Sequence, residues 1–414
     1  MMDRHGMKER IKEYYQAHKD EMRMELLALL GEMVAHKTVN VPSDKLADHP
    51  YLAMRGEEYR IAEIVAREFG RWDIPFVVHE RAKGRSNLIG RVGSGRSDLK
   101  LFMACHMDIV PAGDGWDTDP FLMTERDGKV YGRGVLDNKG PLVSSMLAAR
   151  MMKLALGDDA IDGELQVACL ADEEATDPDG IDYGIGYLLE EKLIDPTYAI
   201  IPDIGENMRK IDVAEKGRVV IKVKARGVQA HGSTPHLGVN AVNRMARFIV
   251  ALESHRLRFD PDPVLVEPTV NLGEVHGGAA ANIVPADCTA VYDFRILPGQ
   301  TPQRVVEELR ELAAPIAPDF SFEIAAASLP HKIDPDNELV ASIQANTREH
   351  LGFTPIPYGL GGGTFAKTLN LRGIKAVGFG PGDDTAFHVA NEFVEIAQLL
   401  DFSCLICLVA LDLL

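Results

Sequence analysis

The segment 101–108, LFMACHMD, constrains the fold more than any other part of this sequence. It begins with a continuous apolar run, which is typical of a strand buried on both faces of a sheet. The run stops at His106 and Asp108, and polar side chains at the carboxyl end of such a strand lie in the crevice where α/β proteins bind ligands. A second segment, GRGVLDNKG, brings Asp137 to the start of a helix that has Pro141 near its first turn. We therefore expect an active site at this edge of a sheet.

Two further apolar runs end in acids. The run ELQVACLADEE ends at Glu173 and Glu174, and the run TYAIIPD ends at Asp203. Taken singly, these acids have ordinary explanations, because Asp137 could cap the helix that follows it and acids at strand ends often face solvent. Together, imidazole and carboxylate groups from several strands are the ligands that Zn²⁺ takes in proteins. A carboxylate shared by two ions about 3.5 Å apart permits a bridging water, beside which hydrolysis needs a general base.

Composition excludes some classes of partner. The chain has 414 residues, 46% of them apolar, which is enough for two domains. Its 44 basic and 62 acidic residues give a net charge of −18, which repels nucleic acid and anionic membrane surfaces. The N-terminus is charged and lacks the apolar core of a signal peptide, so we expect a cytoplasmic protein. The apolar tail 402–414 is shorter than the roughly 20 residues of a membrane span and is expected to form a packed helix.

The cysteines indicate reduced, buried thiols. There are 5 of them, at positions 105, 169, 288, 404 and 407, mostly in apolar strand or helix contexts. Cys404 and Cys407 form a lone CxxC pattern, but it lies in the apolar C-terminal helix, so we expect both side chains to belong to the core.

The order of elements predicts two domains, one inserted into the other. Helical and strand patterns alternate up to about residue 212, which is typical of an α/β domain. From about Val213 the pattern changes, and the segment RVVIKVKARG, residues 218–227, alternates strictly and begins a β-α-β-β-α-β set, typical of a ferredoxin-like α+β domain. We expect residues 1–212 and 332–414 to form a catalytic domain with a mixed, mainly parallel sheet flanked by helices. Residues 213–331 are expected to form an inserted lid or dimerisation domain.

Seven motifs together resemble one family. They are ACHMDIVPAG, YGRGVLDNKGP, LADEEAT, GVQAHGSTPHLGVNA, ANIVPADCTAVYDFRILPG, GGGTFAK and the late His388 before Ala-Asn-Glu. They resemble the co-catalytic di-zinc amidohydrolases that include acetylornithine deacetylase, succinyl-diaminopimelate desuccinylase, glutamate carboxypeptidase, aminoacylase and related dipeptidases. The resemblance implies a zinc-exopeptidase-like fold, two Zn²⁺ per subunit with Co²⁺ or Mn²⁺ as alternatives, and a homodimer.

The resemblance also implies roles for the strand-end residues. His106 would bind one ion with Asp203, His388 would bind the other with Glu174, and Asp137 would bridge the two ions. Glu206 is an alternative ligand at the position given to Asp203. We prefer Asp203 because it ends its strand. Glu173 would be the general base, and Asp108 would orient His106.

Further family roles fall on the inserted domain and a late glycine turn. His231 would stabilise the oxyanion, from its own subunit or from the partner subunit of a dimer, although an ordinary loop histidine is the alternative. The substrate carboxylate would be held by a guanidinium fork and backbone N–H groups, with a structural role as the alternative for Arg295. These substrate-binding residues are Asn282, Arg295, Gly362, Gly363 and Thr364. The Asp137–Asn138 peptide bond is expected to be cis.

The leading functional hypothesis is metal-dependent hydrolysis of the amide bond of a small N-acyl amino acid, through a bridging water activated by Glu173. A metallo-dipeptidase or carboxypeptidase is the alternative, since LDNKGP and GGGTFAK favour dipeptidases whereas the short inserted domain favours deacetylases. A two-metal phosphoesterase is disfavoured by the acidic charge and the lack of a basic phosphate cradle. A non-catalytic metal-dependent binding protein would be expected to lack Glu173.

Overall fold

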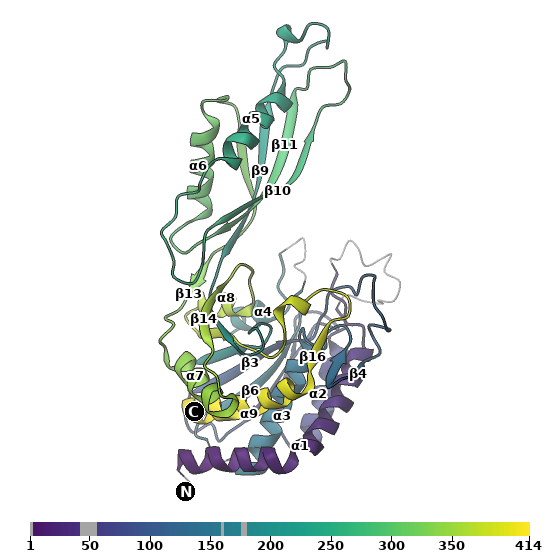
Figure 1. The fold of residues 1–414 in the computed structure, drawn as a ribbon, viewed down its shortest axis with the longest axis vertical. Coiled ribbons are helices and arrows are strands. Elements are labelled where there is room, and N and C mark those ends of the chain that lie inside the picture. Colours follow the sequence, from purple (N-terminus) through teal and green to yellow (C-terminus); the bar gives the residue numbers. More distant parts are fainter. Residues whose placement is uncertain (1–2, 42–55, 159–160, 175–179) are drawn as a thin grey trace. The chain divides into compact units, whose positions relative to one another are not determined.

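The structure is a computed structural model that describes residues 3–41, 56–158, 161–174 and 180–414 (Figure 1). It divides into a first unit, residues 1–213, 333–357 and 364–414, and a second unit, residues 214–332 and 358–363. We had expected residues 358–363 in the catalytic domain. They group instead with the second unit, because the Lys216 N–H donates to the Leu360 carbonyl at 3.0 Å and Gly359 lies against Leu265.

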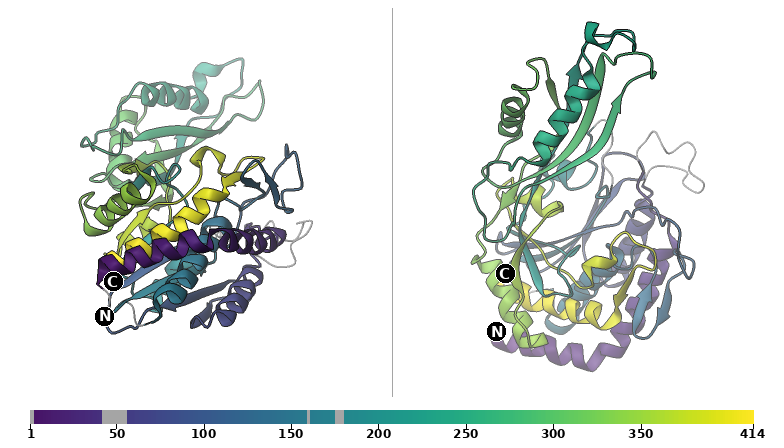
Figure 2. Two further views of the ribbon diagram at one scale, coloured as in Figure 1. Left: turned by 60° about the horizontal axis from the view of Figure 1, so that its bottom comes forward. Right: turned by 45° about the horizontal axis from the view of Figure 1, so that its top comes forward.

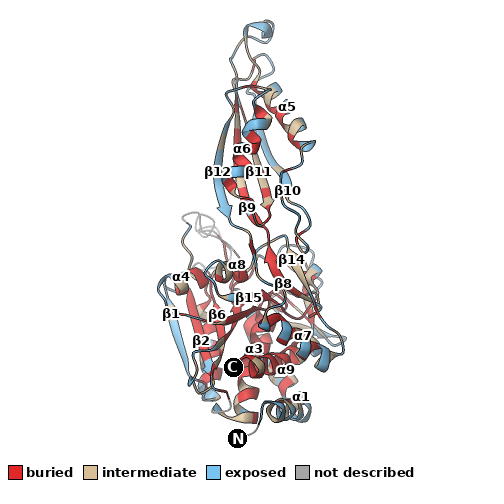
Figure 3. Cartoon of the chain, turned by 90° about the vertical axis from the view of Figure 1, so that its left-hand side faces the viewer, coloured by how far each residue is buried: buried red, intermediate tan, exposed pale blue. Residues whose placement is uncertain are grey.

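The first unit holds most of a mixed sheet in the order β1-β2-β6-β3-β7-β15-β8-β13, with β14 paired to β8. Strand β13 and the last residues of β8 and β14 belong to the second unit. Its strands are β1 Phe76–Glu80, β2 Ser86–Val92, β3 Lys100–His106, β6 Glu164–Leu170, β7 Tyr198–Ile201, β8 Lys210–Glu215, β13 His331–Lys332, β14 Ile356–Leu360 and β15 Lys375–Gly378. The central strands β6, β3, β7 and β15 pair in parallel, and antiparallel pairs flank them on both sides. Parallel strands covered on both faces need continuous apolar runs, as in the buried strands β3 and β6, of which β6 is labelled in Figure 3.

Helices cover this sheet. They are α1 Arg4–Ala35, α2 Tyr59–Arg71, α3 Lys139–Leu156, α4 Ile185–Glu190, α7 Glu338–Leu351, α8 Phe365–Asn370 and α9 Ile396–Leu413. Helix α9 packs against α1, α3 and α7, and Figure 2 shows α1 and α9 side by side. Among the described residues, α9 alone is long and apolar enough to cross a membrane, but 72% of it is buried inside the structure. It is the packed helix that the sequence predicts, and all five cysteines, including Cys404 and Cys407, are free and buried.

A small antiparallel sheet, which the sequence did not predict, joins two distant segments of the first unit. Its order is β16-β5-β4, with β16 Phe393–Glu395, β5 Lys129–Tyr131 and β4 Thr124–Arg126. Phe393 pairs with Tyr131, so the residues that precede β16 lie beside those that follow β5. These neighbouring residues carry His388 and Asp137.

The second unit is an antiparallel sheet with the ferredoxin-like order β10-β11-β9-β12. Its elements are β9 Gly217–Arg226, α5 Ala241–Glu253, β10 Thr269–Gly277, β11 Asp287–Ile296, α6 Pro302–Ala313 and β12 Ser321–Ser328. Strand β9 alternates buried and accessible residues, and its buried side chains form one core with residues of α5 and α6. The two folds confirm the predicted class, an α/β protein with an inserted ferredoxin-like α+β unit.

Helix α2 is attached to β2 by a close packing contact and a buried polar contact. Gly90 has no side chain, and an added Cβ would lie 2.2 Å from the ring of Phe69. At the start of the helix, Glu58 is 0% exposed and accepts a hydrogen bond from Arg85, which is 2% exposed. Burial raises the pKa of Glu58 to about 8. The carboxyl group therefore keeps its proton near neutral pH.

Replacing Glu58 with glutamine tests this assignment. The pKa of Glu58 is about 8 in the folded protein and near 4.5 in the unfolded chain. Between these two pH values the folded carboxyl holds its proton, whereas the unfolded one has lost it. The stability that Glu58 contributes is therefore present below the unfolded pKa and is lost as the pH rises toward the folded value. We expect the urea midpoint of the wild-type protein to fall relative to that of Glu58→Gln between about pH 5 and about pH 8. An unchanged difference between the two proteins would contradict a buried, protonated carboxyl.

Candidate metal centre

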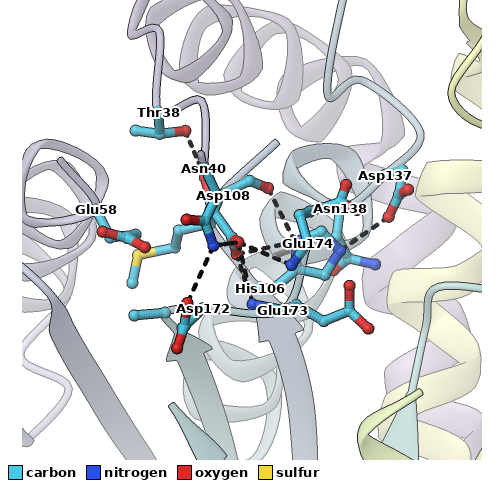
Figure 4. A network of polar contacts seen from close by, with 12 residues as sticks. Thr38, Asn40, Glu58, His106, Asp108, Asp137, Asn138, Asp172, Glu173 and Glu174 are labelled. Carbon is cyan, nitrogen blue, oxygen red and sulfur yellow. Dashed lines mark hydrogen bonds and ion pairs between the residues drawn. The ribbon is translucent and has the colours of Figure 1, made fainter. Parts of the chain in front are cut away.

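The predicted ligands meet at the carboxyl edge of the central strands. His106 ends β3, Glu173 and Glu174 follow β6, and Asp203 follows β7. These three strands are neighbours in the order β6-β3-β7 and run parallel, so their carboxyl ends lie at the same edge. Figure 4 shows His106, Glu173 and Glu174 of this cluster, together with Asp137. Ala175 and Thr176, the last residues of the LADEEAT motif, lie outside the described residues.

Asp137 lies between two histidines. Its Oδ1 is 2.8 Å from Nε2 of His106, and its Oδ2 is 3.0 Å from Nε2 of His388. His388 Nε2 also lies 3.2 Å from Oε2 of Glu174. One carboxylate thus offers a separate oxygen to each of two groups of donors, which is the arrangement expected of a bridging ligand. The Asp137–Asn138 bond is cis, as predicted.

Asp203 joins the cluster through Asn138, whose side-chain amide donates to Oδ1 of Asp203 at 2.5 Å. Asp203 is 6% exposed. The alternative ligand, Glu206, has a side chain that is 38% exposed and lies 3.4 Å from Lys210 Nζ. The structure therefore favours the strand-end acid over its neighbour in the IPDIGEN segment.

These residues fit divalent cations. The donor atoms of His106, Asp137 and Glu174 all lie within 4.8 Å of one another, and imidazole with carboxylate is a set that Zn²⁺, Co²⁺ and Mn²⁺ accept. In the part of the chain that the structure describes, Oε1 of Glu174 is buried and has no hydrogen-bond partner. Burial raises the pKa of Glu174 to about 7, and the negative charge of Asp137 adds to this effect. A cation would stabilise the ionised form of this carboxylate.

Asp108 organises the cluster without being one of its proposed ligands. It is 0% exposed and accepts the N–H groups of Glu173 at 3.0 Å and Glu174 at 2.9 Å. The backbone carbonyl of Asp108 lies 2.9 Å from Nδ1 of His106. A proton on Nδ1 that is donated to this carbonyl leaves the Nε2 lone pair directed at the Asp137 side, where a metal ion would bind.

Glu173 lies directly before Glu174 in the same turn. Burial raises the pKa of Glu173 well above its usual value, and the negative charges of Glu174, Asp203 and Asp137 raise it further. A carboxyl group with a raised pKa is suited to hold a proton between two steps of a hydrolysis.

In the second unit, the structure brings His231 and Asn282 together. The Gly232 N–H donates to the Asn282 carbonyl at 2.7 Å, and His231 pairs with Ile283 as an isolated bridge. Nδ1 of the exposed His231 accepts the Ser233 N–H at 3.1 Å. The neutral imidazole therefore carries its proton on Nε2, where it is available to a ligand.

Arg295 and the glycine turn also lie together. Nη1 of Arg295 is 3.4 Å from the Gly361 carbonyl, and Nε donates to Asp293 at 2.8 Å. Gly362 and Gly363 continue this turn within the second unit. Thr364 belongs to the first unit, and its hydroxyl accepts the Ala366 N–H at 3.1 Å as the N-cap of α8. The Asp293 contact gives Arg295 a structural role within the sheet in addition to the proposed one.

Glu392 is a residue of the site that we did not select from the sequence. It is 0% exposed, and its Oε1 accepts the N–H groups of Gly134 at 3.0 Å, Leu136 at 2.8 Å and Asp137 at 3.2 Å. Its Oε2 accepts from Arg133 at 2.6 Å. A buried carboxylate thus fixes the loop that carries Asp137. The sequence signal that could have identified Glu392 is its position four residues after His388, in the segment HVANE.

Comparisons with known proteins identify the relatives of this chain. Residues 213–321 match a family model described as a peptidase dimerisation domain. The acetylornithine deacetylase of Myxococcus xanthus is 34% identical over 325 residues, covering 75% of this chain and 79% of that protein. Aminopeptidase PepT from Bacillus cereus has a TM-score of 0.70 at 20% identity, covering 94% of this chain and 98% of that chain. A dinuclear metal-binding peptidase of the M20 family from Bacillus subtilis has a TM-score of 0.64 at 13% identity, covering 95% and 100%.

The fold, the ligand cluster and these relatives define a metal-dependent hydrolase that acts on amide bonds. The chain belongs to the M20 family of metallopeptidases and related deacylases.

Glu392→Gln and Glu392→Asp test how the Asp137 loop is held. Glutamine loses the charge that pairs with Arg133, and aspartate is too short to reach the three N–H groups in the same way. We expect either change to weaken metal binding by about 10- to 100-fold, because supporting contacts of this kind orient the ligand. Metal affinity is measured by titration against a chelating indicator. Glu395→Gln is the control, because the Glu395 side chain is exposed at the end of β16. Unchanged affinity in both Glu392 variants would show that the loop holds Asp137 unaided.

Proposed function

We propose that this protein hydrolyses the amide bond of a small N-acyl amino acid at the Asp137 cluster. The observation that carries the proposal is the position of Asp137, with one oxygen facing His106 and the other facing His388. The geometry favours two divalent ions, with zinc as our first choice and cobalt or manganese as alternatives. When bound, these ions would polarise the amide carbonyl and lower the pKa of the attacking water.

In this proposal Glu173 moves the proton. It takes a proton from the attacking water and gives it to the amine nitrogen of the leaving group. Its backbone N–H is held by Asp108, which also contacts His106, so the base and one ligand are fixed relative to the same carboxylate. Glu174 serves instead as a ligand, since its side chain contacts His388.

We propose that His231 stabilises the negative charge that develops on the amide oxygen. Support comes from its tautomer, because Nδ1 accepts the Ser233 N–H and Nε2 is therefore the donor. A donor of this kind acts most strongly in the transition state. The dimerisation-domain match supports a homodimer. In such a dimer the donor is either His231 of the same subunit as Glu173 or the His231 of the other subunit.

We propose that the substrate carboxylate binds in the second unit. Arg295, at the end of β11, supplies a guanidinium group beside the glycine turn. Asn282 precedes the start of β11, at the other end of this strand, so within one chain its amide adds to the group at His231 and not to the site at Arg295. Guanidinium groups bind carboxylates through paired charge-assisted hydrogen bonds. The acyl amino-acid substrate class is supported by the relative from Myxococcus xanthus, an acetylornithine deacetylase.

A substrate panel tests the proposal. The protein is loaded with Zn²⁺, Co²⁺ or Mn²⁺ and assayed with N-acetyl amino acids, N-succinyl amino acids and dipeptides. We expect metal-dependent release of a free amino acid, fastest from an N-acyl substrate. Faster cleavage of dipeptides would favour the metallo-dipeptidase or carboxypeptidase alternative. Metal binding without turnover of any amide would favour a non-catalytic binding protein.

Glu173→Gln and Glu174→Gln separate the proposed base from the proposed ligand. Glu173→Gln is expected to retain the metal content of the wild-type protein and to lose turnover by about 10²- to 10⁴-fold, the usual contribution of a general base. Glu174→Gln is expected to lose metal affinity, because it removes a charged ligand. Metal analysis after dialysis, together with kcat, measures both effects. If Glu173→Gln loses metal and Glu174→Gln does not, the two roles are reversed.

A further inference from the structure

We infer that Arg85 and Asp172 are positioning residues for Glu173, acting through the turn at residues 171–174. This inference rests on the proposed function, in which Glu173 is the general base. Arg85 pairs with Asp172, and Asp172 directly precedes Glu173, so we expect both residues to act on the reaction through this turn.

Asp172 gives the turn an unusual conformation. Its φ is 65°, in the left-handed region, which few residues other than glycine adopt, with aspartate and asparagine the commonest among them. Its carboxylate is held by an ion pair with Arg85 Nη2, by the Asn40 side-chain amide at 3.1 Å and by the Tyr183 N–H at 3.1 Å. Donors from three separate segments therefore fix the residue directly before Glu173.

The opposite side of the turn is fixed by Asp108. The N–H groups of Glu173 and Glu174 donate to this carboxylate at 3.0 and 2.9 Å. Nδ2 of Asn40 links the two sides, because it lies 2.8 Å from Oδ2 of Asp108 and 3.1 Å from Oδ1 of Asp172 (Figure 4). The backbone of the proposed base thus lies between two anchored carboxylates.

Arg85 connects this turn to the sheet. It is 2% exposed, it donates to Glu58 as well as to Asp172, and its guanidinium lies 5.1 Å from the ring centre of Tyr183. Asn87, two residues further along the chain, accepts the Ala171 N–H at 3.0 Å and donates to the Tyr183 carbonyl at 2.8 Å. Because side chains two residues apart share a face of a strand, the start of β2 holds the turn from one side.

Such anchoring matters for a base more than for stability. A shift of about 1 Å in a reacting group can cost roughly 10²-fold in rate. We therefore expect Arg85→Lys and Asp172→Asn to lower kcat by about 10- to 100-fold, with KM and metal content close to the wild-type values. Lysine keeps the charge of Arg85 but cannot contact both acids at once, and asparagine keeps the shape of Asp172 but loses its charge.

Hydrogen exchange tests the anchoring independently of any activity. We expect the amides of residues 171–174 to exchange faster in Arg85→Lys and Asp172→Asn than in the wild-type protein, with the rest of β6 unchanged. Arg150→Lys is the matched control. Arg150 also pairs with two acids, Glu21 and Glu25, and these acids do not belong to the turn at residues 171–174. Unchanged exchange at residues 171–174 in both variants would overturn the inference.

A double-mutant cycle then tests whether the anchoring acts through Glu173. In the Glu173→Gln background, we expect Arg85→Lys to cause no further loss of the residual turnover of the fastest N-acyl substrate. A full additional loss in that background would show that Arg85 supports the fold generally and would overturn the inference. If Glu173→Gln itself keeps full turnover while exchange changes as expected, the proposed base is wrong and the anchoring of the turn stands.

Discussion

Electrostatic repulsion among the carboxylates at one edge of the central sheet is the constraint on which the rest of the structure depends. Asp108, Asp137, Glu174 and Asp203 are brought to this edge by neighbouring strand ends and by the loop before α3. Buried like charges in a low-dielectric site raise each other's pKa unless opposite charges or N–H donors compensate them. Here the compensation comes from backbone N–H groups at Asp108, from histidines at Asp137 and, when bound, from divalent cations.

The same constraint explains why segments far apart in the chain are tied so firmly to the site. Asp137 and His388 are 251 positions apart, and β5 and β16 bring their segments together as paired strands. Glu392 then fixes the loop of Asp137 with three backbone N–H groups. A ligand set assembled from such distant parts needs a supporting layer of contacts, because each loop alone has many conformations.

The sequence predicted those features that depend on local pattern. An apolar run that stops at a polar residue identifies a strand and its carboxyl end together, so His106, Glu174 and Asp203 could be found, and the alternation of β9 revealed the inserted fold. Glu392 and the β5–β16 pairing could not be found in this way, because their partners are set by tertiary contacts between distant segments. Residues 358–363 were misplaced for the same reason, since their partner strand precedes them by more than a hundred residues.

The pairing at the two ends of the second unit has a consequence for how this chain is assembled. Ala214 pairs with Lys332 and Glu215 with His331, so residues 214–332, the main segment of this unit, begin and end on adjacent antiparallel strands. With respect to the first unit, the whole insertion is equivalent to the loop of a hairpin. The entropic cost of closing such a loop grows only slowly with its length. The architecture therefore tolerates exchange of this segment for one of another size, which allows the inserted unit to evolve while the cluster around Asp137 is kept.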